Sequence, residues 1–161
     1  MMQVQGAAYE SAPLVTRPAN TTAYSANDVV GGVITFSGLG PAGEGRVIVS
    51  AALRYDVAAV PAGMANMRLY LYSVTPPSAL DDNAAWDLPS GDRAAFIGYV
   101  DLGTPVDLGS TLFVQQDNLN KLIKLDGAEN TLYGYLVTTG GGYTPAANSE
   151  TFRVTLRTRA V

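Results

Sequence analysis

The chain has 161 residues, 47% of them hydrophobic and 15% charged, a composition that suits one domain with a well-filled core. It contains no cysteine and no histidine, which excludes disulfide bonds, thiolate zinc sites, cysteine nucleophiles and a serine–histidine triad. The net charge of −4 argues against nucleic-acid binding, because a phosphate backbone attracts basic surfaces.

Residues 1–15 begin with small and polar side chains and end in the apolar pair Leu14 and Val15, and Pro13 suits the edge or the start of a strand. We expect an N-terminal arm over residues 1–15 and a single β-sandwich domain over residues 16–161. The N-terminus lacks a basic start followed by an apolar run, and no apolar stretch approaches the length of a membrane span. A soluble protein made in a cytoplasm, with no membrane partner, is therefore expected.

Apolar and polar side chains alternate along most of the remaining segments, which is the period of a strand with one buried face. The clearest case lies near the C-terminus, where Phe152, Val154 and Leu156 alternate with arginine and threonine. Turns rich in glycine, proline, aspartate and asparagine separate the segments about every 8 to 12 residues, which predicts an all-β sandwich or barrel. The expected strands cover residues 33–37, 46–56, 67–74, 95–101, 110–116, 120–125, 131–138 and 150–158.

One short helix is predicted, over residues 79–88. Pro76 and Pro77 end the preceding strand, and Ser78 followed by Asp81 has the hydroxyl-to-carboxylate spacing of a capping box.

Four aspartates lie in and just after this helix: Asp81, Asp82, Asp87 and Asp92. Their oxygens are of the type that binds calcium, but their spacing lacks the EF-hand pattern. We favour helix capping and solvated charge over a metal site. No catalytic group, metal or cofactor is expected.

Trp86 has two interpretations. Its flat ring could stack on sugars together with the tyrosines, as in a carbohydrate-binding module. A single tryptophan in a capped helix is more often a packing plug over the end of a sandwich, and we favour that interpretation. The run Gly140-Gly141-Gly142 lacks the Gly-Lys-Ser/Thr of a phosphate-binding loop, so it is interpreted as a flexible loop.

Two of the expected strands carry rows of tyrosines beside rows of leucines. If the leucines face the gap between two sheets, the pleat turns the tyrosines to the opposite face. An exposed row of aromatic rings favours an association surface and a homo-oligomer. Alternatively, the tyrosines form the core, or a loop or the N-terminal arm shields them. The interface candidates in these rows are Tyr70, Tyr72, Tyr133 and Tyr135.

Residues 16–32 combine Thr16-Arg17-Pro18, Thr22-Ala23-Tyr24 and Asp28-Val29-Val30-Gly31 at the start of a strand. This run resembles the opening of many small structural proteins of tailed bacteriophages and prophages. The resemblance implies a non-enzymatic, capsid-associated protein with a jelly-roll-like antiparallel β-sandwich. The expected role is that of a decoration (cement) protein that binds and stabilises the head shell, and no catalytic residue is carried over.

The implied partners are the major capsid protein or other virion proteins, and the implied location is the virion, after synthesis in the bacterial host cytoplasm. A homo-oligomer, such as a trimer, is expected. Arg17 and Tyr24 are further interface candidates, although together with Asp28 they would equally serve to pin a loop by hydrogen bonds. Two alternatives stay open: a neck, tail or fibre component of the virion, and a carbohydrate-binding β-sandwich module.

Overall fold

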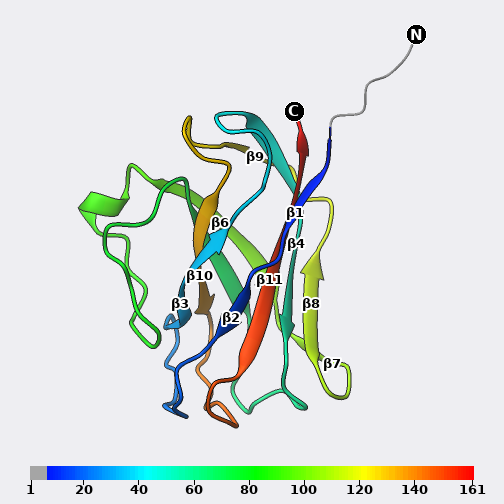
Figure 1. Cartoon of the computed structure of the whole chain (residues 1–161). Helices are drawn as coiled ribbons and strands as arrows, with labels where there is room; N and C mark the ends of the chain where they lie inside the picture. The colour runs from blue at the N-terminus through cyan, green and yellow to red at the C-terminus, as the bar shows by residue number, and fades with distance from the viewer. Residues whose placement is uncertain (1–6) are drawn as a thin grey trace.

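The structure, a computed structural model, describes residues 7–161 and consists of two antiparallel β-sheets that enclose a common core (Figure 1). The first sheet contains β1 (Tyr9–Ser11), β2 (Leu14–Thr16), β4 (Gly45–Tyr55), β7 (Val106–Asp107), β8 (Leu112–Gln116), β9 (Lys121–Lys124) and β11 (Thr151–Ala160). The second contains β3 (Val29–Phe36), β5 (Met67–Tyr72), β6 (Phe96–Gly103) and β10 (Leu132–Thr138). The expected all-β sandwich is confirmed.

The strand order is that of a jelly roll. β1 and β2 both pair with β11, and β8 and β9 both pair with β4, so each of these couples forms one interrupted strand of the first sheet. Counted this way, and with the two-residue edge strand β7 left out, the first sheet contains the first, eighth, third and sixth strands of the chain, and the second sheet contains the second, seventh, fourth and fifth. Two Greek keys folded over one another produce this order.

Side chains of β11 alternate between buried and more exposed positions, as the sequence predicts. Phe152, Val154 and Leu156 are fully buried between the sheets, while the intervening side chains are more exposed. From β4, Ala51, Leu53 and Tyr55 meet them in the same core. The period of two therefore places one face of the central strands inside the sandwich.

The N-terminal segment lies along the edge of the first sheet. β1 and β2 pair with β11 in register from Tyr9 opposite Thr158 to Thr16 opposite Thr151. Part of the expected arm is thus strand, and residues 1–6 of that arm lie outside the described residues.

The predicted helix over residues 79–88 is wrong. Ala79 and Asn83 have positive φ angles of 46° and 66°, which no continuous right-handed helix allows. Ser78 does not cap a helix with Asp81; its hydroxyl and its N–H instead donate to the distant carboxylate of Asp92. Asp92 itself belongs to a short 3₁₀ helix, η1 (Ser90–Asp92).

Residues 73–95, which connect β5 to β6 and include the range of the expected helix, cover the outer face of the second sheet and are called the covering segment (Figure 1, green). Its Leu80 and Trp86 pack on the tyrosine rows, and Trp86 stacks on Tyr70 with ring centroids 3.6 Å apart and planes at 8°. Trp86 also donates its indole N–H to the hydroxyl of Tyr72, at 3.1 Å. A second apolar cluster therefore lies outside the sandwich core, beneath this segment. Within residues 7–161 no helix has the length and apolar character needed to cross a membrane.

Candidate functional site: a groove above a buried arginine

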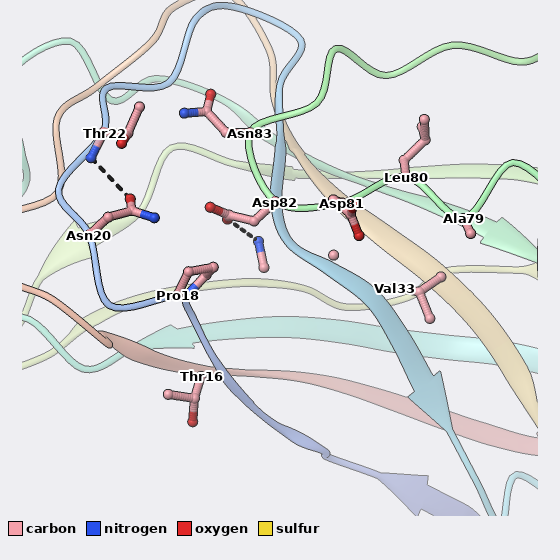
Figure 2. Close-up of a pocket in the computed structure, with 12 residues that line it drawn as sticks. Thr16, Pro18, Asn20, Thr22, Val33, Ala79, Leu80, Asp81, Asp82 and Asn83 are labelled. Atoms are coloured by element: carbon pink, nitrogen blue, oxygen red, sulfur yellow. Dashed lines mark hydrogen bonds between the residues drawn. The ribbon is translucent and has the colours of Figure 1, made fainter.

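A groove of about 720 Å³ opens at one corner of the sandwich, where the edges of the two sheets meet (Figure 2). Three segments line it: the connection from β2 to β3, the first half of β3, and residues 79–83 of the covering segment. The first two belong to the stretch that resembles phage structural proteins. That stretch therefore forms one wall and the floor of the groove.

The floor is a bulge in β3 made by two consecutive glycines. Val30 pairs with Leu136 and Val33 with Tyr135, so Gly31 and Gly32 have no partners on β10. Their φ angles of 81° and 79° are ones that glycine adopts readily.

Gly31 is further constrained by a close approach. A Cβ at this position would lie 2.7 Å from Cγ1 of Val15 and 3.0 Å from the ring of Phe152. The backbone N–H of Gly31 donates to Oδ1 of Asp82 at 2.7 Å, which ties the bulge to the covering segment (Figure 2).

Arg17 stands between Thr16 and Pro18, which line the groove, and is 1% exposed. Its Nε donates to the hydroxyl of Tyr24, and that hydroxyl donates to Oδ1 of Asp82 at 2.5 Å. The Nη atoms make no hydrogen bond within the described residues; Nη1 is 3.8 Å from a carboxylate oxygen of Glu150, and Nη2 is 4.0 Å from one of Asp82. One guanidinium thus links three connections of the jelly roll.

Glu150 is held by a second set of buried groups. Its Oε1 accepts the N–H groups of Ala146 and Ala147, at 2.8 and 3.0 Å. Its Oε2 accepts the hydroxyl of Tyr55 at 2.7 Å, and the hydroxyl of Tyr143 lies 3.2 Å from that of Tyr55. The carboxylate is therefore fully hydrogen-bonded although it is buried.

The pKa values of the three tyrosines and of the arginine in this network are raised. Burial raises the pKa of Tyr24, Tyr55 and Tyr143, because the phenolate would lose its hydration. For Arg17, burial alone would lower the pKa, but the hydrogen bond to Tyr24 and the nearby charges outweigh it and the pKa is raised. The tyrosines stay protonated and the arginine stays charged at neutral pH, so the network holds loops together and does not exchange protons there.

The rim of the groove carries polar groups that can still bind a partner. Asn20 and Thr22 lie on one side, with Oδ1 of Asn20 accepting the N–H of Thr22 at 3.1 Å, and Asp81 and Asn83 lie on the other (Figure 2). Among residues 7–161 no three His, Cys, Asp or Glu side chains come together as a metal site would require. Hydroxyl, amide and carboxylate groups around an open groove suit hydrogen bonding to another surface.

The six interface candidates lie differently from what their sequence pattern suggests. Tyr70, Tyr72 and Tyr135 do face away from the leucine core, but the covering segment buries them, so the expectation that they are exposed is wrong. The structure instead shows the alternative interpretation, in which a loop shields these tyrosines. Tyr133 alone keeps a partly exposed side chain and donates its hydroxyl to Glu129 at 2.9 Å.

Arg17 and Tyr24 are likewise buried and pin the loops together, as their alternative interpretation states. Asp28 has the same effect locally, since its Oδ2 accepts the N–H of Ser25 at 2.6 Å. Trp86 has the packing role favoured for it, against Tyr70.

The sequence reasoning missed Asp82, Tyr55, Tyr143 and Glu150 as members of one network. The sequence predicts a helix around Asp82, and the other three lie far from Arg17 in the chain. A glutamate at the start of an otherwise alternating strand was the one local signal, and it does not identify its partners.

The described residues form a jelly roll with a polar groove at one corner. No protein-family model matches the sequence, and no curated protein does. Among solved structures, the chain is similar to the capsid of Ralstonia phage GP4, at 16% identity and a TM-score of 0.48, with 100% of this chain and 89% of that chain covered.

It is also similar to a chain of the cyanophage Pam1 capsid asymmetric unit, at 12% identity and a TM-score of 0.41, with 100% and 90% covered. The globular domain of the zebrafish complement 1qA protein gives 11% identity and a TM-score of 0.34, with 98% of each chain covered. All three TM-scores are below 0.5, so the likenesses carry no function over to this chain.

Proposed function

We propose that the protein is a non-enzymatic structural component of a bacteriophage virion, and specifically a decoration protein that binds the head shell. The observation that carries this proposal is the position of residues 16–32. The stretch that resembles phage structural proteins contributes Asn20 and Thr22 to the rim of the groove and Gly31 to its floor. Its Arg17 lies close to the carboxylates of Asp82 and Glu150 and so links the surrounding loops. The jelly roll itself is an architecture of viral capsid domains, although a fold alone does not fix a function.

The proposed mechanism is mechanical. A domain bound across the joint between neighbouring shell subunits adds buried surface there, and that surface must be separated before the joint opens under internal pressure. Such a role needs a rigid body. The loops around the groove meet this need, because Arg17, Asp82 and Glu150 tie them to one another.

The first test localises the protein. Particles made by the phage or prophage that encodes the chain are purified and washed, and their proteins are identified by peptide mass spectrometry. Cryo-electron microscopy then compares these particles with particles that lack the gene. We expect density on the head shell that disappears with the gene and returns when purified protein is added. Density at the neck, tail or fibres would select that alternative, and absence from washed particles would contradict a virion role.

The second test concerns the groove. Asp81→Lys reverses a charge on the rim, and we expect it to weaken binding to gene-deleted particles about tenfold or more, since like charges across an interface are costly. Asp87→Lys is the matched control, because Asp87 is an exposed aspartate of the same segment that does not line the groove. Equal binding by both variants would show that the protein contacts the shell through another face.

A further inference from the structure

A second groove, of about 470 Å³, lies between β6 and residues 119–121. This size falls within the range of about 300 to 1,000 Å³ that is usual for pockets that bind small molecules. Its most conspicuous member is Tyr99, which is 49% exposed. The other tyrosines on the outer face of this sheet are buried or partly buried, so Tyr99 is the ring that the covering segment leaves open.

Tyr99 is held rigidly although it is exposed. It projects from a strand, with the guanidinium of Arg68 4.2 Å from its ring centroid. The ring of Tyr70 meets it at 60°, with centroids 5.8 Å apart. Two neighbours thus fix the orientation of the ring while about half of the residue stays accessible to solvent.

Asp101 stands two residues further along β6, on the same outward side. Its Oδ1 accepts hydrogen bonds from Nε of Arg68 at 2.7 Å and from Nδ2 of Asn66 at 3.2 Å. Among the described residues its Oδ2 has no partner, and about half of the side chain is exposed. The hydrogen bond from Arg68 lowers the pKa of Asp101, so the free oxygen is a charged acceptor at neutral pH.

The opposite wall supplies donors and apolar surface. Asn120 is exposed, and Lys121 reaches across the groove so that its Nζ lies 2.6 Å from where a Cβ on Gly98 would be. Lys121 forms no ion pair with any residue from 7 to 161. Leu119 adds an aliphatic contact. The groove therefore combines one open aromatic ring with an acceptor on one side and donors on the other.

We infer that this groove binds a pyranose sugar. A pyranose has an apolar face of C–H groups, which suits the flat ring of Tyr99, and a rim of hydroxyls that both donate and accept hydrogen bonds. Asp101 accepts from those hydroxyls, while Asn120 and Lys121 donate to them. A protein partner would need a larger apolar contact than one ring and one leucine. The inference is independent of the head-shell proposal, because it concerns the opposite edge of the second sheet.

The test is titration of ¹⁵N-labelled protein with methyl glycosides of glucose, galactose and glucuronic acid, followed by amide chemical shifts. At least one glycoside should give saturable shifts at Tyr99, Asp101 and Asn120, with a dissociation constant of about 1 to 10 mM. Tyr99→Ala should weaken this binding tenfold or more, and Tyr99→Phe should retain it because the ring is kept. Asn120→Ala should weaken it several-fold.

Tyr9→Ala is the matched control. Tyr9 also stacks on an arginine, with Arg46 4.9 Å from its ring centroid, but it lies on β1 in the other sheet. This variant should bind as the parent chain does, and all variants are first shown to be folded by their β-type circular dichroism. The inference is overturned if no glycoside gives saturable shifts, if Tyr99→Ala binds normally, or if the open-chain polyol sorbitol binds equally well. Loss of particle binding by Tyr99→Ala without any sugar binding would assign the surface to a protein contact and overturn it too.

Discussion

Arg17 shows how a single side chain organises this molecule. It is fully buried, yet its two Nη atoms have carboxylates only at 3.8 and 4.0 Å and no hydrogen bond within the described residues. A buried charge of this kind adds little net stability by itself, because desolvation offsets the attraction. Its removal, however, leaves the carboxylates of Asp82 and Glu150 without their countercharge.

We predict that Arg17→Met destabilises the fold by about 3 to 5 kcal/mol, measured by urea unfolding. Arg54→Met is the control, because Arg54 and Asp56 form an exposed pair at 3.1 Å whose loss should cost about 1 kcal/mol or less. The triple change Arg17→Met, Asp82→Asn, Glu150→Gln should recover part of the stability, since no buried charge is left unpaired. Equal stability of the Arg17 and Arg54 variants would mean that the network does not hold the loops.

The buried tyrosines should make the free energy of unfolding fall at alkaline pH. Burial raises the pKa of Tyr72 to about 12 and also raises the pKa values of Tyr24, Tyr55 and Tyr143. The unfolded chain loses these protons near pH 10, before the folded chain does. The stabilisation is therefore complete below about pH 10 and is lost as the pH rises toward the folded-state values.

We predict alkaline unfolding between about pH 10 and 12, with each of these tyrosines contributing about 1.4 kcal/mol per pH unit. Phenolate absorbance and far-ultraviolet circular dichroism should show that the tyrosines ionise together with loss of the fold. Tyr72→Phe should make the dependence less steep. Ionisation of all nine tyrosines near pH 10 with the fold intact would contradict the prediction.

At the scale of elements, the β3 bulge and the covering segment depend on each other. Gly31 presses against Val15 and Phe152 and donates its N–H to Asp82, while Asn83 donates its backbone N–H to the carbonyl of Val29 at 2.8 Å. The free edge of β3 is thereby partly paired with residues of the covering segment. An edge strand that is covered in this way is protected from pairing with other chains.

We predict that Gly31→Ala destabilises the protein by about 3 kcal/mol, because the new methyl meets two apolar side chains and the backbone is left-handed. Gly140→Ala is the control: Gly140 has the same kind of φ, 82°, but a Cβ there meets nothing within 4 Å. We expect Gly140→Ala to lower the free energy of unfolding by about 1 kcal/mol. Thermal unfolding of the two variants measures the difference, and equal losses would show that packing at the bulge is loose.

At the scale of the whole molecule, residues 7–161 form two apolar clusters, one between the sheets and one beneath residues 73–95. They share the second sheet, whose leucines face one cluster and whose tyrosines face the other. Because a single sheet separates them, separation of the covering segment would uncover the tyrosine rows of that sheet. We therefore expect the clusters to unfold as one unit.

We predict a single unfolding transition in urea. The fluorescence of Trp86, the one tryptophan in the chain, reports the outer cluster, and far-ultraviolet circular dichroism reports the sheets. Their midpoints should coincide. An earlier fluorescence transition would show that the covering segment detaches while the sandwich persists, and the tyrosine rows would then become available for association.

Local alternation in the sequence was sufficient to predict the sandwich. Side chains on a strand point to opposite faces in turn, so the runs around Phe152 and Leu69 encode which face is buried without reference to any other element. The same rule correctly turned the tyrosines away from the leucine core. These features depend on neighbours in the chain, which is why the sequence alone determined them.

Tertiary structure decided what covers the tyrosines and what binds the charges. Ser78 matches a capping box with Asp81, but its hydroxyl donates to Asp92, because the segment spreads over a sheet whose apolar face must be buried. Arg17 and Glu150 lie far apart in the chain, and only the jelly-roll order brings their loops together. The two grooves likewise join segments that are distant in the chain, since a pocket depends on side chains converging in space and no pattern of neighbouring residues records that convergence.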